Sequence, residues 1–232
     1  IGRSDGVVLG SARLAIVDTS FGCQPFSDES GSILVVFNGE ITNYRDLSAQ
    51  LQALGHRLAS HCDGEVIAHA YEEFGVTFAE YLDGQFAIAL YDRRSNRLVL
   101  ARDRMGICPL VWAWNGITLS FASEAKALFA ANLPSPRPDP RGLAQLCYFG
   151  TTVAPQTMFA GVNALPAAHY LVIDSTASPK LTRYWRLRYP EKDAGRRLDW
   201  EAAREELDTL LVRAVGRCVQ GEFAPVTYLS GG

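Results

Sequence analysis

The sequence has no long apolar segment and no strong excess of charge of either sign. No run of about 18 apolar residues is present, so a membrane-spanning helix is not expected. The 22 Lys and Arg residues and 25 Asp and Glu residues leave a net charge of −3, which supports neither a nucleic-acid partner nor a membrane-surface partner. At 48% hydrophobic and 20% charged, the 232 residues resemble an ordinary globular protein of one large domain, or of one domain and part of another.

Disulfide and metal-binding patterns are also missing. The cysteines are odd in number and none has Cys-x-x-Cys spacing: Cys23, Cys62, Cys108, Cys147 and Cys218. Reduced thiols and a cytoplasmic location are therefore expected, since the start also lacks a basic and apolar leader. No metal site is predicted, because no histidine has a partner at ligand-like or triad-like spacing. His56, His61, His69 and His169 are expected to be structural or at the surface.

Apolar periodicity predicts strands and helices in mixed order. Strands are expected at 7–9, 14–17, 33–37, 86–91, 97–101, 111–114, 117–121 and 170–174. Helices are expected at about 43–54, at 64–74 after an N-cap at Asp63, at 124–131, and at 200–219 after an N-cap at Asp199. The proline-dense segment 134–140 is predicted to be an extended surface crossing. Trp112, Trp114 and Phe121 are expected in the core or at a domain interface, and Asp103 and Arg104 as a buried ion pair.

The end of the strand predicted at 33–37 carries groups suited to acyl transfer. Asn38 supplies a carboxamide donor, and Gly39 supplies a backbone N–H that a ligand can approach without obstruction. Such a pair can form an oxyanion hole. Glu40 places a carboxylate beside them, suited to an ammonium group. Taken alone, Asn-Gly more often marks a strand that ends in a turn.

Six segments in series change that interpretation: ARLAIVD at 12–18, FNGEI at 37–41, CDGEVI at 62–67, ARDRMG at 101–106, FASEAKAL at 121–128 and LPAAHY at 165–170. Together they resemble the glutaminase domain of the asparagine synthetase family of class II glutamine amidotransferases. The final YLSGG at 228–232 resembles the first half of that family's pyrophosphate-binding loop.

The resemblance implies an α+β fold. Residues 1–188 would form a four-layer αββα sandwich of the Ntn type. A linker over 189–197 would lead to residues 198–232, which would be the first helix and strand of an α/β ATP-pyrophosphatase domain. The family's nucleophile is an N-terminal cysteine activated by its own α-amine. Ile1 has no nucleophilic atom, so the sequence is interpreted as a fragment that would not itself hydrolyse glutamine.

The resemblance also implies roles for particular residues. For glutamine, Arg13 would bind the α-carboxylate, Asp63 and Glu40 would bind the ammonium, and Asn38 and Gly39 would stabilise the oxyanion. The backbone at Ile16 and Val17 would contact the ligand. ATP, with Mg²⁺ on its phosphates, would bind at Leu229, Ser230, Gly231 and Gly232.

The implied activity is that of a glutamine-hydrolysing, ATP-consuming ligase that converts aspartate to asparagine. Its partners would be small molecules: glutamine, ATP and an acid acceptor. The sequence leaves open whether the protein forms a homodimer. Departures from the family pattern at Ser11, Thr42 and Cys108 favour a specialised relative. One alternative is a relative with a remnant glutaminase domain, as in β-lactam synthetases and lasso-peptide cyclases. The other is a non-catalytic binding module.

Overall fold

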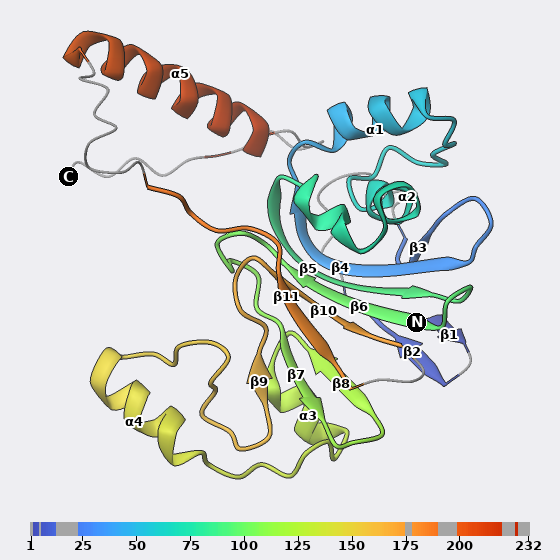
Figure 1. Ribbon diagram of the computed structural model, residues 1–232, viewed down its shortest axis with the longest axis vertical. Helices are drawn as coiled ribbons and strands as arrows, with labels where there is room; N and C mark the ends of the chain where they lie inside the picture. Colours follow the sequence, from blue (N-terminus) through green and yellow to red (C-terminus); the bar gives the residue numbers. More distant parts are fainter. Residues whose placement is uncertain are drawn as a thin grey trace.

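The computed structural model describes residues 2–4, 6–12, 23–174, 178–189, 199–219 and 226 (Figure 1). The strands are β1 Gly2–Ser4, β2 Val7–Leu9, β3 Phe26–Ser27, β4 Ile33–Ile41, β5 Gly84–Asp92, β6 Arg97–Arg102, β7 Val111–Trp114, β8 Leu119–Ala122, β9 Asn163–Ala164, β10 His169–Ile173 and β11 Lys180–Arg183. The α-helices are α1 Tyr44–Ala53, α2 Glu65–Phe74, α3 Ala125–Ala130, α4 Pro140–Phe149 and α5 Trp200–Cys218, and a 3-10 helix covers Gly75–Glu80.

A six-stranded antiparallel sheet in the order β11-β10-β6-β5-β4-β3 forms the centre of the molecule. β4 and β5 pair along their whole length, from Ile33 opposite Asp92 to Ile41 opposite Gly84. β10 pairs with β6, so the predicted strand near 170–174 does return to the sheet built by the first half of the chain. Two smaller sheets, β8-β7-β9 and β1-β2, hold the other strands of the described residues.

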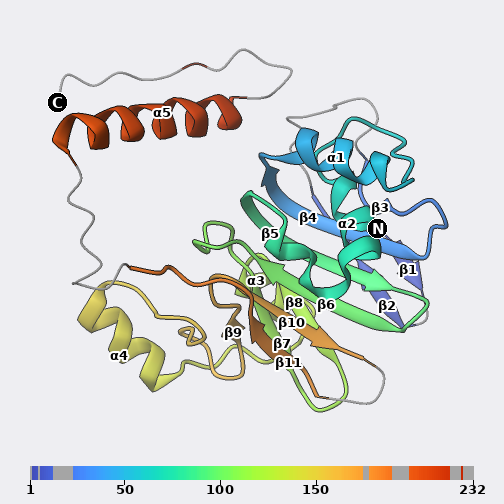
Figure 2. The same cartoon turned by 45° about the horizontal axis from the view of Figure 1, so that its top comes forward.

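The first apolar core lies between the large sheet and the helices α1 and α2. Residues two apart on a strand share a face. On β4 the odd-numbered apolar residues, from Ile33 to Ile41, therefore pack together against Leu47 and Leu51 of α1 and Val66 of α2. Figures 1 and 2 show both helices on the same side of β4 and β5.

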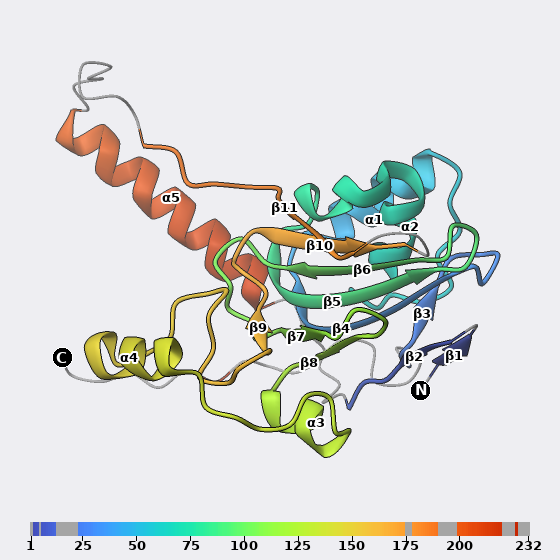
Figure 3. The same ribbon diagram turned by 60° about the horizontal axis from the view of Figure 1, so that its bottom comes forward.

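Two further apolar clusters define the remaining layers. Val36 and Leu100, on the opposite face of the large sheet, pack with Leu110 and with the half-buried Trp112 and Phe121 of the small sheet. A third cluster, centred on Leu128 of α3, covers the outer face of that small sheet. Helices, sheet, sheet and helix thus follow one another (Figure 3), and the predicted αββα sandwich is confirmed.

Two predictions about secondary structure were wrong in their extent. β4 continues to Ile41 rather than stopping at Phe37, because β5 pairs with it across Asn38 and Gly39. The proline-dense segment is extended only in part, because its last proline begins α4. Asp139 caps that helix by accepting hydrogen bonds from the N–H groups of Arg141 and Gly142, at 2.8 and 3.3 Å.

The last helix, α5, agrees with the prediction for 200–219, including its N-cap, since Asp199 Oδ2 accepts from the Ala202 N–H at 3.4 Å. Arg217 links α5 to the main body through Asp83, at 3.1 Å. The boundary expected at 189–197 falls almost wholly outside the described residues, as does the strand expected after α5. No helix among the described residues has the length and apolar character needed to cross a bilayer.

Candidate active site

The candidate site lies on the second half of β4, where apolar residues give way to polar ones. Leu34 and Val36 face the second sheet, and the alternation of the strand places Asn38 and Glu40 on the same face. Asn38 is exposed and Glu40 is half-buried. An amide and a carboxylate therefore stand on one face of the sheet, with Cα atoms about 6.6 Å apart, a span that a glutamine side chain can bridge.

Gly39 lies between them in a conformation that favours glycine. Its φ is +137°, and a Cβ at this position would overlap the carbonyl oxygen of Gln85 on β5. The strand partner of Gly39 is Phe86, whose N–H and carbonyl both bond to Asp103, at 3.2 and 2.9 Å. Because the polar groups of Phe86 point away from β4, the N–H of Gly39 points to the other edge of β4.

The N–H groups on either side of Gly39 along that edge already have acceptors. Gln24 accepts from the N–H of Phe37 at 2.9 Å and donates to its carbonyl at 2.8 Å. Asp63 Oδ2 accepts from the N–H of Ile41 at 3.0 Å. β3 pairs with β4 only near Val35, so it does not reach Gly39. The N–H of Gly39 is thus held between two fixed donors, which is how a preorganised oxyanion donor is built.

Two carboxylates stand near this donor. Asp63 is buried, and Glu40 is close enough to feel its charge. Burial raises the pKa of Glu40 above its ordinary value, and repulsion from Asp63 raises it further. A bound ammonium group would relieve this repulsion, so the pair is suited to a cationic ligand.

The structure brings four of the predicted site residues together: Asn38, Gly39, Glu40 and Asp63. Arg13, Ile16 and Val17 lie outside the described residues. The prediction that Asp63 caps α2 was wrong. The N-cap of α2 is Gly64, without a side-chain hydrogen bond, because the Asp63 carboxylate is used by β4 instead.

Comparison with known proteins identifies the family. The family model described as a glutamine amidotransferase domain matches residues 1–185. The chain belongs to the glutamine amidotransferase domain family. Over 228 residues it is 37% identical to the glutamine-hydrolyzing asparagine synthetase 2 of Bacillus subtilis (strain 168). The aligned segment covers 95% of this chain and 30% of the relative. It is 34% identical to the amidase chry2 of Gibberella zeae, over 97% of this chain and 33% of the relative.

The chain therefore spans about a third of the length of the curated relatives it matches. A solved structure entitled "Structure of the allosteric regulatory enzyme of purine biosynthesis" has a TM-score of 0.50 and 20% identity, covering 70% of this chain and 31% of that one. At this identity the likeness concerns the fold alone, and it agrees with the expected Ntn-type sandwich.

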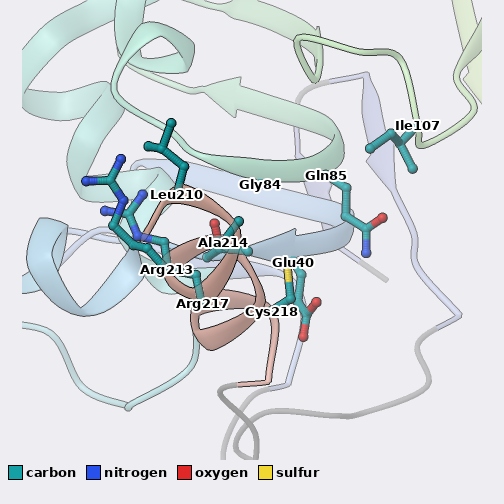
Figure 4. A pocket seen from close by; sticks show the side chains of 10 residues that line it. Glu40, Gly84, Gln85, Ile107, Leu210, Arg213, Ala214, Arg217 and Cys218 are labelled. Carbon is teal, nitrogen blue, oxygen red and sulfur yellow. The ribbon is translucent and has the colours of Figure 1, made fainter. Parts of the chain in front are cut away.

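Hollow space lies along the polar face of β4 in this glutamine amidotransferase domain. Glu40 lines a cavity of about 710 Å³ together with Gln85, Ile107 and residues of α5. Figure 4 shows α5 next to β4, with Ala214 and Cys218 labelled near Glu40 among the residues that line this cavity. A second cavity, of about 580 Å³, is lined by Asn38 and lies between the two sheets. Both polar side chains of β4 thus open onto space that a small molecule can enter.

Asp103 is buried as predicted, but its role differs: it holds the strand opposite the site. Asp103 is fully buried, and its carboxylate accepts the N–H groups of Phe86, Met105, Ile107 and Cys108, at 3.0 to 3.2 Å. The predicted ion pair with Arg104 was wrong, because Arg104 pairs with Asp83 at 2.8 Å. Asp103 and Gln24 both act on the main chain around Gly39, and a single sequence offers no local pattern for either contact.

Replacing Gly39 with alanine is expected to lower the free energy of unfolding by about 3–5 kcal/mol, because the new Cβ would collide with main chain. The matched control is Gly55→Ala, whose φ of +105° is also unfavourable but which has open space around it. That control should cost about 1–2 kcal/mol. Denaturant unfolding measures both, and equal costs would contradict the close approach of β4 and β5.

Proposed function

We propose that this domain binds glutamine and hydrolyses its side-chain amide, within a longer synthetase that uses the released ammonia to form an amide. The observation that carries the proposal is the position of the Gly39 N–H, next to the side-chain amide of Asn38. The N–H groups on either side of it along the same strand edge are fixed by hydrogen bonds to Gln24 and Asp63. Two such donors can bind the negative oxygen of a tetrahedral intermediate.

In this proposal the remaining polar groups hold the two charged ends of glutamine. Glu40 and Asp63 bind the α-ammonium group, because a positive charge between the two carboxylates relieves their mutual repulsion. Arg13 binds the α-carboxylate and the backbone at Ile16 and Val17 contacts the ligand, as the family resemblance implies.

The nucleophile is proposed to be an N-terminal cysteine of the complete protein. Its α-amine accepts the thiol proton, the thiolate attacks the amide carbon, ammonia leaves with that proton, and water hydrolyses the resulting thioester.

For the second half of the reaction, we propose an acyl-adenylate made from ATP and an acid, with aspartate as the acid and asparagine as the product. Leu229, Ser230, Gly231 and Gly232 would hold ATP with its Mg²⁺. They lie outside the described residues, so this part rests on the sequence and on relatives named as asparagine synthetases. A different acceptor acid is the second candidate, because relatives named as amidases are 34% and 33% identical to the chain over 97% of its length.

A remnant domain or a pure binding module is the less favoured interpretation. A remnant domain would have no use for this site, and a pure binding module would have no use for its oxyanion donor. A cytoplasmic location belongs to the proposal as well. It is supported by the absence of any disulfide bond among the five cysteines, all of which lie in the described ranges.

The full-length protein provides the test. L-Glutamine should bind in calorimetry and be hydrolysed to glutamate and ammonia, whereas D-glutamine should do neither. Pyrophosphate release that depends on aspartate would support asparagine synthesis, and release with another acid alone would replace aspartate as the acceptor. A full-length protein that neither binds nor hydrolyses L-glutamine would overturn the proposal.

The affinity for glutamine should depend on pH through Glu40. The ammonium group needs an ionised carboxylate, and the pKa of Glu40 is raised by burial and by Asp63. Affinity should therefore be full above that raised pKa and fall as the pH drops through it, by up to about tenfold per pH unit. Calorimetry at a series of pH values measures this, and Glu40→Gln should bind more weakly and lose the step. An unchanged step in Glu40→Gln would assign the titration to another group.

A further inference from the structure

A cluster of two histidines and two glutamates lies away from the candidate active site. Glu29 comes from the turn between β3 and β4, His56 follows α1, and His69 and Glu72 are three residues apart on α2. One ligand atom from each lies within 4.8 Å of the others. The sequence pattern gave no hint of this site, because the two histidines are separated by a helix start and a loop.

The two histidines present the same nitrogen to the centre of the cluster. His56 Nδ1 lies 3.7 Å from Glu29 Oε1 and 3.7 Å from Glu72 Oε2. His69 Nδ1 lies 3.3 Å from Glu29 Oε2. In a tetrahedral zinc site with bonds of 2.0–2.2 Å, neighbouring ligand atoms are about 3.3–3.6 Å apart. The four groups need only small side-chain movements to reach that geometry.

His69 is the group that most needs a partner. Its side chain is only 1% exposed, and neither ring nitrogen makes a hydrogen bond of acceptable geometry with the described residues. Glu29 Oε2 is near Nδ1 but lies off the direction in which that nitrogen could donate. A buried polar group without a hydrogen bond typically costs about 1–3 kcal/mol, so such groups in native proteins call for a ligand or another explanation.

The second nitrogen of each imidazole, Nε2, also faces a carboxylate, as is common for histidines that bind metals. His56 Nε2 lies 3.5 Å from Glu73, and His69 Nε2 lies 3.6 Å from Glu65. Glu65 is fixed in turn by the N–H groups of Ala59 and Ser60, at 2.5 and 2.7 Å. Histidine ligands commonly face a carboxylate with their second nitrogen, which sets the tautomer and strengthens the metal bond.

We propose that Glu29, His56, His69 and Glu72 bind one divalent transition-metal ion of the Zn²⁺ class. Two imidazoles with two carboxylates favour zinc over Mg²⁺ or Ca²⁺, which prefer oxygen ligands alone. With all four positions filled by protein, the site is structural: it ties the turn before β4 to α1 and α2. This inference does not depend on the proposed glutamine chemistry.

A proton is the competing occupant. Burial lowers the pKa of His69, but Glu65, Glu29 and Glu72 raise it above its ordinary value. A protonated His69 among these carboxylates would need no metal. The two explanations differ in what they predict for added zinc at pH 7.5, where a bound metal would replace the proton.

The experiment uses chelator-treated full-length protein with Zn²⁺, Mg²⁺ and Co²⁺ as probes. Wild-type protein should bind one more equivalent of Zn²⁺ than the variant His56→Gln. Added Zn²⁺ should raise the melting temperature of the wild type by at least about 4 °C. Glu72→Gln should bind this equivalent about a hundredfold more weakly. The control His169→Gln, on β10 in the opposite part of the sheet, should behave as wild type. Co²⁺ should give the visible absorption of a tetrahedral ion in wild type and control only.

Equal zinc stoichiometry in wild type, His56→Gln and Glu72→Gln would overturn the proposal, since bound zinc would then be adventitious or elsewhere. A melting temperature that responds to pH but not to Zn²⁺ would assign the cluster to a proton. Because His56 and Glu72 are partly exposed, their glutamine variants are expected to fold, which circular dichroism checks.

Discussion

Asn38→Ala in the full-length protein should reduce kcat for glutamine hydrolysis by about 10²–10³-fold, with a much smaller change in KM. The side chain of Asn38 faces the cavity between the sheets, next in the chain to Gly39, whose N–H points to the open edge of β4. Oxyanion donors bind the transition state more strongly than the substrate, so their loss appears mainly in kcat. Steady-state ammonia release measures both constants.

The isosteric variant Asn38→Asp tests the same role in a second way. It keeps the shape but puts a carboxylate where negative charge develops, so kcat should fall at least as far as in the alanine variant. Neither variant should alter the unfolding free energy by more than about 1 kcal/mol, because the side chain is exposed. A fall confined to KM would instead make Asn38 a substrate-binding residue.

Asp103→Ala should lower the free energy of unfolding by about 4 kcal/mol or more. The substitution leaves four main-chain N–H groups without their acceptor in a fully buried position. Each unsatisfied buried donor costs about 1–3 kcal/mol, and the loop that they hold also loses its anchor. Denaturant unfolding, followed by circular dichroism, measures the change.

Two variants bracket the Asp103 prediction. Asp103→Asn retains one acceptor oxygen and should fall between wild type and alanine. Asp46→Ala removes an acid whose side chain is 82% exposed, and should change stability by no more than about 0.5 kcal/mol. If Asp103→Ala were as mild as Asp46→Ala, the carboxylate would not organise this loop.

The elements predicted well are those whose signal is local. α1, α2 and α5 carry apolar residues at helical spacing, and β5 with β6 forms a hairpin across a short polar turn. The helix α4 shows the limit of composition. A dense run of prolines suggested only extended chain, although Asp139 followed by Pro140 is itself a helix start.

The candidate site was predictable in residue type but not in geometry. The FNGEI segment pointed to Asn38, Gly39 and Glu40, yet β4 was expected to end where it continues. Its continuation depends on β5, more than 40 residues away, whose Gly84 and Gln85 allow the two strands to approach closely. Pairing between distant strands leaves no mark within either one.

Contacts that join distant segments were invisible for the same reason. Gln24 reaches Phe37, Asp103 reaches Phe86, and Glu29 reaches His69, each across a separation that only the folded chain closes. Asp63 illustrates the converse. Its place before a helix predicted a cap, but tertiary packing assigned its carboxylate to β4.

The sequence by itself determined the family, the alternation that sorts β4 into two faces, and the kinds of polar group at its end, because these depend on residue identity and short-range periodicity. Only the tertiary structure decided which N–H groups are occupied, which carboxylates repel one another, and which histidines meet. Those properties depend on distances and burial, and burial is set by the packing of layers that are far apart along the chain.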